Sequence, residues 1–554
     1  MNFTGNIKTL NVLKILDEQR TAQISLSAKN PKNPQNVKFS QKNRKNSKKS
    51  GSRARASLRV WAAPKVLGFL LIFIFLSTTP LLAVSPNNRP STPSYTWNIT
   101  GIDTFTPVPA PAPYRFSRSV YPEDMGVSSL TGVTEILHHD GRFFITNGPS
   151  LVVTNYDLVA EQIITGAYLD GVWQDFGGLN GLFITDNGDI YVVETSAGRI
   201  WHLDSEFNTI RVLGRPEGIP LAETFAWQPL KVAVDQHGRI YTIANNVFEG
   251  IVEINADGSF NRYFGVLDVR FSAVELFWRN LATQAQLAQA SLWLPINFTN
   301  MDIHPDGFVF ATLADEPGAK MLNARGDNIM RNPFGDPGEY PVGDVEFPSR
   351  VFNAPTGPSI SSIIRYFDAG MYYVWDSNRN RVFAYDQDGN LLFAFGGQGT
   401  AEGRLLNVVG MTMTADRLLL ADRGNRSIEV FDLTSYGAAV INAARLTFDN
   451  NYMQAADAWL DVIDYNPFHQ LAHLGVGKAL FRQGLFAESI PYFQQAQAVE
   501  YYSLAFARVR QDAVDRYFDT AVIAVAIFAA VIVAIRLFRR FGKFPMVKKG
   551  RAAL

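Results

Sequence analysis

Short apolar runs alternate with polar residues through the middle of this chain, and each run follows a tight turn. Six of these runs alternate at period two: Asp140–Thr146, Asn187–Val193, His237–Ile243, Asp306–Thr312, Ala369–Trp375 and Ala415–Ala421. Alternation behind a turn predicts antiparallel strands rather than helices. The glycines of the first five turns, at 141, 188, 238, 307 and 370, lie 47, 50, 69 and 63 residues apart. Repeats of this length, each with several short strands, predict the blades of a β-propeller.

The predicted fold is an all-β propeller over residues 114–433 with six blades, and five or seven blades are the alternatives. The sixth unit ends at Leu433 before a fourth strand is reached, so we expect an N-terminal strand, Tyr114–Val120, to complete the last blade. Such closure removes an exposed sheet edge. The insertion Phe271–Leu294 has apolar residues at helical spacing and predicts a helix on the propeller rim.

The last two units carry a shared turn motif. Asp376–Val382 reads DSNRNRV and Asp422–Ile428 reads DRGNRSI. Both resemble the D-x-x-N-x-R-[IV] core of NHL repeats, and the Gly-rich segment Phe395–Leu405 is similar to the connectors of that family. NHL repeats build propellers, so the resemblance supports the fold. It implies that the motif residues brace the turns between blades, namely Asp376, Arg381, Asp422, Asn425 and Arg426.

After Leu433 the hydrophobic period becomes helical. Tyr452, Ala455 and Trp459 recur 34 residues later as Phe486, Ser489 and Phe493, and Gly477 provides a small residue for close helix approach. A 34-residue period resembles tetratricopeptide repeats, which are pairs of antiparallel helices. We expect a small all-α domain of such repeats over 436–518, with a capping helix at 504–518. Because two repeats are fewer than such arrays usually need, the domain should dock on the propeller or on a partner. A plain helical hairpin is the alternative.

Charge is strongly segregated, although the whole chain has a net charge of zero. Residues 1–65 hold fifteen Lys and Arg against Asp17 and Glu18, and residues 536–554 hold seven basic residues and no acid. Basic ends around an acidic middle favour membrane topology over nucleic-acid binding. We therefore expect no nucleic-acid partner.

Two apolar runs near the ends support a membrane location. Residues 66–84 have the length and composition of either a signal peptide or a transmembrane helix. Residues 520–538 have those of a transmembrane helix. Residues 1–65 are expected to be a disordered cytoplasmic tail, 85–113 a Pro-rich linker, and 539–554 a second basic cytoplasmic tail. The propeller and the helical repeats would then lie outside the cytoplasm.

Composition also limits the chemistry. The chain has no cysteine, which excludes disulfides and thiolate metal sites. It contains no G-x-S-x-G elbow, H-E-x-x-H pair, P-loop or dinucleotide fingerprint. No cofactor is expected beyond a possible divalent cation.

The cation prediction rests on a second resemblance. Leu179–Glu194 resembles the Asn-Gly stretch of gluconolactonase-type propellers, which hold a metal in the central channel. This implies Asn180 and Asn300 as ligands. Lys231 holds the matching position between them, and the other units offer Thr131 and Val408, with no acid. The competing interpretation is that both asparagines satisfy turn backbone.

Three functions remain open. The first is a membrane-anchored interaction scaffold that binds a protein or glycan outside the cytoplasm. The second is a metal-dependent lactonase or esterase, although the missing acid makes an enzyme the less favoured reading. The third is a carbohydrate-binding surface protein, indicated by Trp173, Trp227, Trp278 and Trp293, whose rings could stack on sugars.

Overall fold

The structure of the chain is a computed structural model that describes residues 94–101, 104–266, 297–314, 318–332, 343–344 and 358–541. All of them belong to one compact unit, 84–554. The predictions for 1–65, 66–84 and 271–294 fall outside the described residues, and of the predicted tail 539–554 only 539–541 are described.

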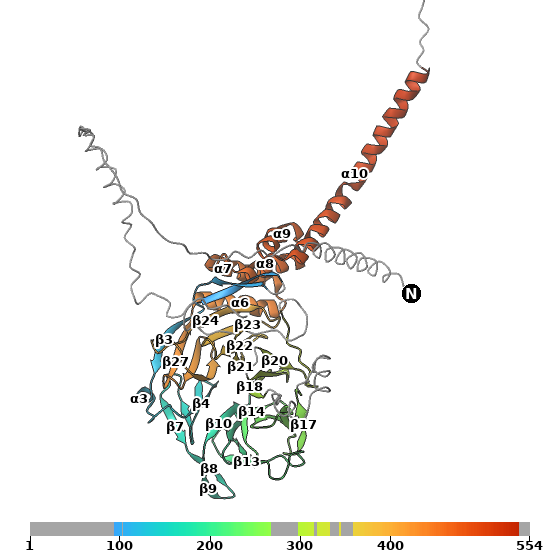
Figure 1. Cartoon of the computed structure of the whole chain (residues 1–554). Coiled ribbons are helices and arrows are strands. Elements are labelled where there is room, and N and C mark those ends of the chain that lie inside the picture. The colour runs from blue at the N-terminus through green and yellow to red at the C-terminus, as the bar shows by residue number, and fades with distance from the viewer. Residues whose placement is uncertain are drawn as a thin grey trace, which may run out of the picture. The chain divides into compact units, whose positions relative to one another are not determined.

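Within the described residues, six antiparallel sheets of three or more strands follow one another, which confirms the six-bladed propeller (Figure 1). The first three blades have four strands each: β4 (Val133–His139), β5 (Arg142–Asn147), β6 (Ser150–Thr154) and β7 (Ala160–Ile164); β10 (Leu179–Ile184), β11 (Ile190–Glu194), β12 (Arg199–Leu203) and β13 (Thr209–Leu213); β14 (Pro229–Val234), β15 (Ile240–Ala244), β16 (Ile251–Ile254) and β17 (Phe260–Phe264).

The other three blades are less uniform. Their strands are β18 (Phe298–Ile303), β19 (Val309–Leu313) and β20 (Ala319–Leu322); β21 (Ser361–Tyr366), β22 (Tyr372–Asp376), β23 (Arg381–Tyr385) and β24 (Leu391–Gly396); β25 (Val408–Met413), β26 (Arg417–Asp422) and β27 (Ser427–Leu433). A hairpin of β8 (Gly166–Leu169) and β9 (Val172–Asp175) separates blades one and two, and a short helix, α3 (Pro122–Met125), precedes blade one.

The last blade is closed by the N-terminal strand, as predicted. Strand β3 (Tyr114–Val120) pairs with β27, with Val120 opposite Ile428 and Tyr114 opposite Leu433. The two ends of the propeller are thereby joined in one sheet, and the edge of β27 is covered.

The linker predicted over 85–113 needs correction in its described part. Strands β1 (Ser94–Gly101) and β2 (Thr104–Pro109) pair antiparallel, and Tyr95 of β1 pairs with Ala394 of β24. The prediction of a linker is wrong here because it rests on prolines, which favour extended linkers, and β2 contains two of them. They are compatible with a sheet here because β2 is an edge strand, where a missing N–H costs little.

Hydrophobic cores lie between neighbouring blades. Between blades one and two, Phe144 and Val153 pack with Leu182 and Trp201, all less than 5% exposed. Each sheet is therefore covered on both faces by its neighbours, which is why the middle strands read as nearly continuous apolar runs.

Five helices follow the propeller: α6 (Ser435–Phe448), α7 (Tyr452–Tyr465), α8 (Gln470–Arg482), α9 (Phe486–Gln495) and α10 (Val499–Phe541). Thr434 caps α6, since its side chain accepts a hydrogen bond from the Gly437 amide. The 34-residue period places α6 with α7 in one pair and α8 with α9 in the next.

Helix α10 corrects another boundary. The capping helix expected at 504–518 and the span expected at 520–538 are parts of one 43-residue helix, about 64 Å long. Its sequence contains neither Gly nor Pro, so nothing in it interrupts the helix. Its first turns pack on α9, where the rings of Phe493 and Tyr501 stack at 5.4 Å, and from Phe506 onward nearly every side chain is exposed.

Candidate functional site: the channel and the propeller–helix junction

The first strands of the six blades surround the central channel and share one irregularity. In each ladder the register shifts after the first pair, which is a β-bulge. The first residues that pair after the bulge occupy equivalent positions: Glu135, Lys231, Asn300, Ile363 and Gly410. In β10 pairing resumes at Leu182, so the equivalent residue there is Gly181.

A buried ion network joins these strands. One carboxylate oxygen of Glu135 lies 2.5 Å from Lys231 Nζ, and the other lies 2.6 Å from Arg365 Nη2. The exposed fractions of the three side chains are 1%, 16% and 7%. Burial alone would raise the pKa of Glu135, but Arg365 and Lys231 outweigh it, and the pKa of the carboxyl lies below its usual value. Glu135 is therefore ionised and paired on both sides.

Arg365 extends the network to two more blades. Its Nε donates to the carbonyl of Met411 in β25 at 3.2 Å, and its Nη1 donates to that of Met301 in β18 at 3.3 Å. One guanidinium thus joins blades four, five, six and one, while Lys231 adds blade three. Polar contacts thus link the inner strands of five of the six blades.

Gly181 explains how Lys231 reaches Glu135 past the blade between them. A Cβ added at Gly181 would lie 2.6 Å from the carbonyl of Leu230 and 2.9 Å from the Cα of Lys231. Because these contacts are with backbone, only glycine lets β10 approach β14 this closely.

The predicted metal ligands lie on these strands but do not occupy equivalent positions. Asn180 is the bulge residue of β10 and donates to Thr195 Oγ1 at 2.8 Å, whereas Asn300 follows the bulge of β18 and accepts from the Ile364 amide at 3.2 Å. Within the part of the chain that the structure describes, no three His, Asp or Glu side chains gather to hold a metal. The metal site stays a prediction.

One part of the sequence interpretation was wrong. The sequence offers Thr131 and Val408 as the matching positions of blades one and six, without an acid. The ladders instead place Glu135 and Gly410 there. The acid is present, but its two oxygens contact basic side chains.

The two NHL-like aspartates make equivalent bonds. Asp376 accepts from the amides of Ile360 and Asn378, and Asp422 accepts from those of Asn407 and Gly424. Each carboxylate thus ties its own turn to the segment that enters the same blade's first strand. Asn425 adds bonds to Asp422 and to the carbonyl of Arg404.

The motif arginines differ from each other. Arg381 pairs with Asp376 in the ladder and contacts Asp344 at 2.7 Å, whereas Ser427 has that ladder position in blade six. Arg426 is exposed, and its backbone is in the left-handed region with φ 58°. Asn380 has the same conformation at the equivalent position of blade five. The two sequences are therefore offset by one residue within the turn.

The residues of the 34-residue period meet across helix α8. A Cβ added at Gly475 would lie 2.5 Å from the Trp459 ring, and one added at Gly477 would lie 2.7 Å from the Phe493 ring. Ala455 and Ser489 are buried at the equivalent positions, while Tyr452 and Phe486 are half-buried beside Arg482 and Phe481. Aromatic side chains thus fill the spaces that the glycines leave between helices.

The helical repeats share a hydrophobic core with blades five and six. Tyr373 and Leu392 of the propeller belong to one buried cluster with Val440 of α6 and Val476 of α8. At its edge, Arg445 of α6 pairs with Asp368, at 2.7 Å between Nε and Oδ2. Docking on the propeller, one of the two expected alternatives, is what the structure shows.

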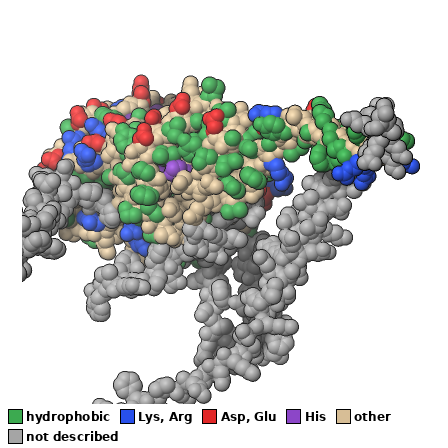
Figure 2. Space-filling view, turned by 90° about the horizontal axis from the view of Figure 1, so that it is seen from above, with side chains coloured by type: hydrophobic (Ala, Val, Ile, Leu, Met, Phe, Trp, Pro, Cys, Tyr) green, Lys and Arg blue, Asp and Glu red, His purple; other side chains and the backbone are tan. Residues whose placement is uncertain are grey.

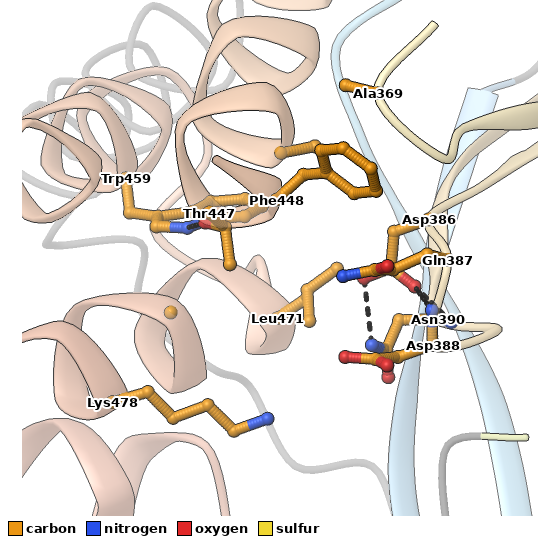
Figure 3. A pocket seen from close by; sticks show the side chains of 12 residues that line it. Ala369, Asp386, Gln387, Asp388, Asn390, Thr447, Phe448, Trp459, Leu471 and Lys478 are labelled. Atoms are coloured by element: carbon orange, nitrogen blue, oxygen red, sulfur yellow. Dashed lines mark hydrogen bonds between the residues drawn. The ribbon is translucent and has the colours of Figure 1, made fainter. Parts of the chain in front are cut away.

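A small pocket remains in this junction (Figure 3). The turn Asp386–Asn390 between β23 and β24 forms one side, and Phe448, Trp459 and Lys478 from three helices line the other. Its volume of about 40 Å³ has room for about three water molecules. The pocket is therefore too small for a metabolite. Burial raises the pKa of Asp386 to about 6.

His469 lies in the same junction and is fully buried. Its Nδ1 accepts from the Ala472 amide at 3.2 Å, so the proton is on Nε2, which donates to the carbonyl of Leu392 at 3.2 Å. Burial lowers the pKa of His469 to about 4. The imidazole is neutral and joins α8 to blade five.

The candidate sugar-stacking residues are scattered. Trp173 on β9 is 46% exposed and packs edge-on against Tyr168, which is 62% exposed, but Trp227 is buried. Trp278 and Trp293 lie outside the described residues.

Helix α10 is the one helix in the described ranges that is long and apolar enough to cross a membrane. Hydrophobic side chains cover much of its surface (Figure 2). This supports the predicted C-terminal span, while the side of the membrane is not fixed by the helix itself.

Comparison with known proteins agrees with the helical part. The family model described as tetratricopeptide repeat matches residues 448–503. No curated protein matches the sequence. The chain combines a six-bladed propeller with tetratricopeptide-like helices, a combination typical of protein-interaction scaffolds.

Solved structures give weak likenesses. A streptogramin B lyase is 14% identical with a TM-score of 0.34, covering 57% of this chain and 97% of that one. Virginiamycin B lyase from Staphylococcus aureus is 12% identical with a TM-score of 0.31, covering 63% and 97%. A protein of unknown function from Bacteroides caccae is 11% identical with a TM-score of 0.31, covering 55% and 93%. Likeness at this level carries no argument about activity.

Proposed function

We propose that this protein is a membrane-anchored scaffold that holds a protein partner outside the cytoplasm. The observation that carries the proposal is the shared core of the propeller and the helical repeats. Tyr492 of α9 packs against that core and Phe493 of α9 stacks on Tyr501 of α10, so two modules that commonly bind other proteins are joined to one helix that is long and apolar enough to cross a membrane.

The sidedness of the proposal comes from charge. The seven basic residues of 536–554, without an acid, follow the apolar part of α10 directly. Positively charged flanks stay on the cytoplasmic side. The propeller and the repeats, which precede the apolar part, would then lie on the other side.

The channel supports a scaffold more than a lactonase. A lactonase of the gluconolactonase type needs carboxylate or amide oxygens free to bind a metal. Both oxygens of Glu135 contact cations, and the Asn300 amide oxygen accepts from the backbone. An ammonium group beside them would also repel a divalent cation.

Sidedness can be tested with single cysteines, because the natural chain has none. Asp157→Cys, at a 74% exposed side chain on the propeller, should react with a membrane-impermeant maleimide in intact cells. Leu554→Cys should react only after permeabilisation. The reverse pattern would overturn the proposed orientation, and labelling of both variants in intact cells would contradict a C-terminal membrane span.

Scaffolding itself can be tested with the full chain in its membrane. Crosslinking from a photoreactive residue placed at Leu460, which is 37% exposed on α7, should yield one reproducible protein adduct. The matched control is the same residue at Val514 on α10, 52% exposed. No adduct specific to the α7 position would count against a partner on the helical repeats.

A further inference from the structure

One face of the helical repeats is left uncovered by the docking. Helices α6 and α8 face the propeller, where they contribute to the shared core. On the outer side of α7 and directly after it, four large apolar side chains are exposed: Met453 (70%), Leu460 (37%), Tyr465 (50%) and Phe468 (70%). So many exposed apolar side chains within sixteen residues are typical of an interaction surface.

Aspartates alternate with these apolar residues. Met453, Asp457, Leu460 and Asp464 follow one another at spacings of four, three and four, so they form one stripe along α7, and Asp461 lies beside it. We call this stripe with Asp461, Tyr465 and Phe468 the α7 face. A partner on the α7 face would meet apolar contacts and carboxylates in turn.

The carboxylates are uncompensated. Helix α7 contains no Lys or Arg, and in the described ranges Asp457, Asp461 and Asp464 have no ion-pair partner. Like charges three and four residues apart destabilise a helix, and an acid near the C-terminal end also opposes the helix dipole. The free protein therefore carries an electrostatic cost that a basic partner would remove.

The basic side chains of the repeats are engaged elsewhere. Arg445 of α6 pairs with Asp368, and Lys478 lies over the ring of Tyr501 at 5.0 Å. Arg482 lies over the ring of Tyr452 at 4.7 Å, so it contacts α7 only at the first residue of the helix and pairs with none of its aspartates. Lys478 and Arg482 are both on α8. The α7 face thus keeps its negative charge.

Helix α10 shows that this imbalance is particular to α7. Between Phe506 and Asp519 it also has three exposed aspartates, Asp512, Asp515 and Asp519, but the same segment holds three exposed arginines, Arg508, Arg510 and Arg516. Opposite charges at helical spacing make α10 a balanced, solvated surface. It provides a matched control for α7.

We propose that the α7 face binds a segment of a partner protein in which Lys or Arg alternates with apolar residues at helical spacing. The proposal rests on the scaffold function and states the chemistry of its partner. Charge complementarity selects this occupant: a second copy would bring the same acidic face, and anionic lipid headgroups would also be repelled. Apolar contacts supply the affinity, and the aspartates select the partner and speed its association.

The test uses the full chain in nanodiscs of neutral phosphatidylcholine and a fluorescent peptide with Lys and Leu at alternating helical positions. Wild-type protein should bind the peptide with an affinity that falls as salt is raised. The triple variant Asp457→Asn/Asp461→Asn/Asp464→Asn should bind at least tenfold more weakly and lose most of the salt dependence. The triple variant Asp512→Asn/Asp515→Asn/Asp519→Asn should stay within twofold of wild type.

A second variant separates the apolar contribution. Leu460→Ala/Phe468→Ala should weaken binding and leave the salt dependence unchanged. The Asn variant of α7 should unfold at the same or a higher temperature than wild type, because it removes repulsion, so weaker binding cannot be attributed to misfolding. The proposal would be overturned if the two triple variants bound the peptide equally well. It would also be overturned if a peptide with Glu in place of every Lys bound wild-type protein as tightly as the Lys peptide. Neither result depends on membrane sidedness, so failure here is distinguishable from failure of the scaffold proposal.

Discussion

His469 donates a hydrogen bond from Nε2 to the carbonyl of Leu392 at 3.2 Å, across 77 positions of sequence. The bond joins the first turn of α8 to β24 of blade five. It requires a neutral ring, because Nδ1 must accept from the Ala472 amide at the same time. The junction between propeller and repeats is therefore sensitive to protonation.

Acid should weaken this junction. The pKa of His469 is about 4 in the folded protein and about 6.5 when unfolded. Between these two values the unfolded chain binds more protons than the folded protein. The contribution of His469 to stability is therefore fully present above pH 6.5 and is lost as the pH falls toward 4. The loss should approach roughly 3 kcal/mol.

Denaturant unfolding of wild type and His469→Gln across this range measures the effect. Glutamine can still donate to Leu392 but does not titrate, so the variant should lack the acid-induced loss. Asp386 acts in the opposite sense, since its raised pKa adds stability at low pH, but it is common to both proteins and cancels in the difference. Identical pH profiles would show that His469 does not carry this sensitivity.

Removing one partner of the buried ion network in the channel should lower the free energy of unfolding. Arg365→Met leaves the buried Glu135 with Lys231 alone and removes two bonds to strand carbonyls. We expect a loss of about 3–5 kcal/mol in the free energy of unfolding. Arg325→Met is the control: it breaks an ion pair whose side chains are 83% and 55% exposed, and should change stability by less than about 0.5 kcal/mol. Similar effects of the two substitutions would mean that the network does not hold the ring together.

Glycine at 477 should be required for close packing. In Gly477→Ala the new methyl would lie 2.7 Å from the Phe493 ring, and overpacking of this kind costs about 1–3 kcal/mol. Gly214→Ala is the control, because no atom lies within 4 Å of its added Cβ. Thermal unfolding should show a lower midpoint only for Gly477→Ala. A midpoint at or above that of wild type would mean that the repeats relax around the methyl group.

Divalent metals should not stabilise the protein. A ligand at 100 times its dissociation constant raises stability by about 2.7 kcal/mol. With Glu135 paired and Asn300 bonded to backbone, the unfolding midpoint should be the same in chelator and in millimolar calcium, magnesium, manganese or zinc. A rise with one metal that Asn180→Ala or Asn300→Ala abolishes would instead support the lactonase alternative.

Most of the fold could be predicted because its signals are local. Period-two runs behind glycine turns identified the blades, the unit that ended at Leu433 required a strand such as β3, and the recurrence of Trp459 as Phe493 identified the helical pairs. Each of these signals depends on a spacing that the backbone geometry fixes. The single helix α10 could also have been predicted, from the lack of Gly and Pro over its length.

The channel network could not be read in the same way. Glu135 lies six residues before its turn glycine, whereas Lys231 and Asn300 lie seven before theirs. Counting from the turns therefore misaligns blade one by one residue. Asn180 lies eight residues before Gly188, so it falls in the bulge, whereas Asn300 follows the bulge. Contacts between Glu135, Lys231 and Arg365 arise only when the ring closes, and no local pattern encodes them.

The most direct test of the account is native-state hydrogen exchange of the full chain in nanodiscs. If propeller and repeats are one body, buried amides of α8, such as those of Val476 and Ala479, should exchange with the same opening free energy as those of Leu392 and Phe393 in β24. The contrary result is an opening free energy several kcal/mol lower for the α8 amides than for the β24 amides. It would show that the repeats open independently of the propeller and would contradict the account.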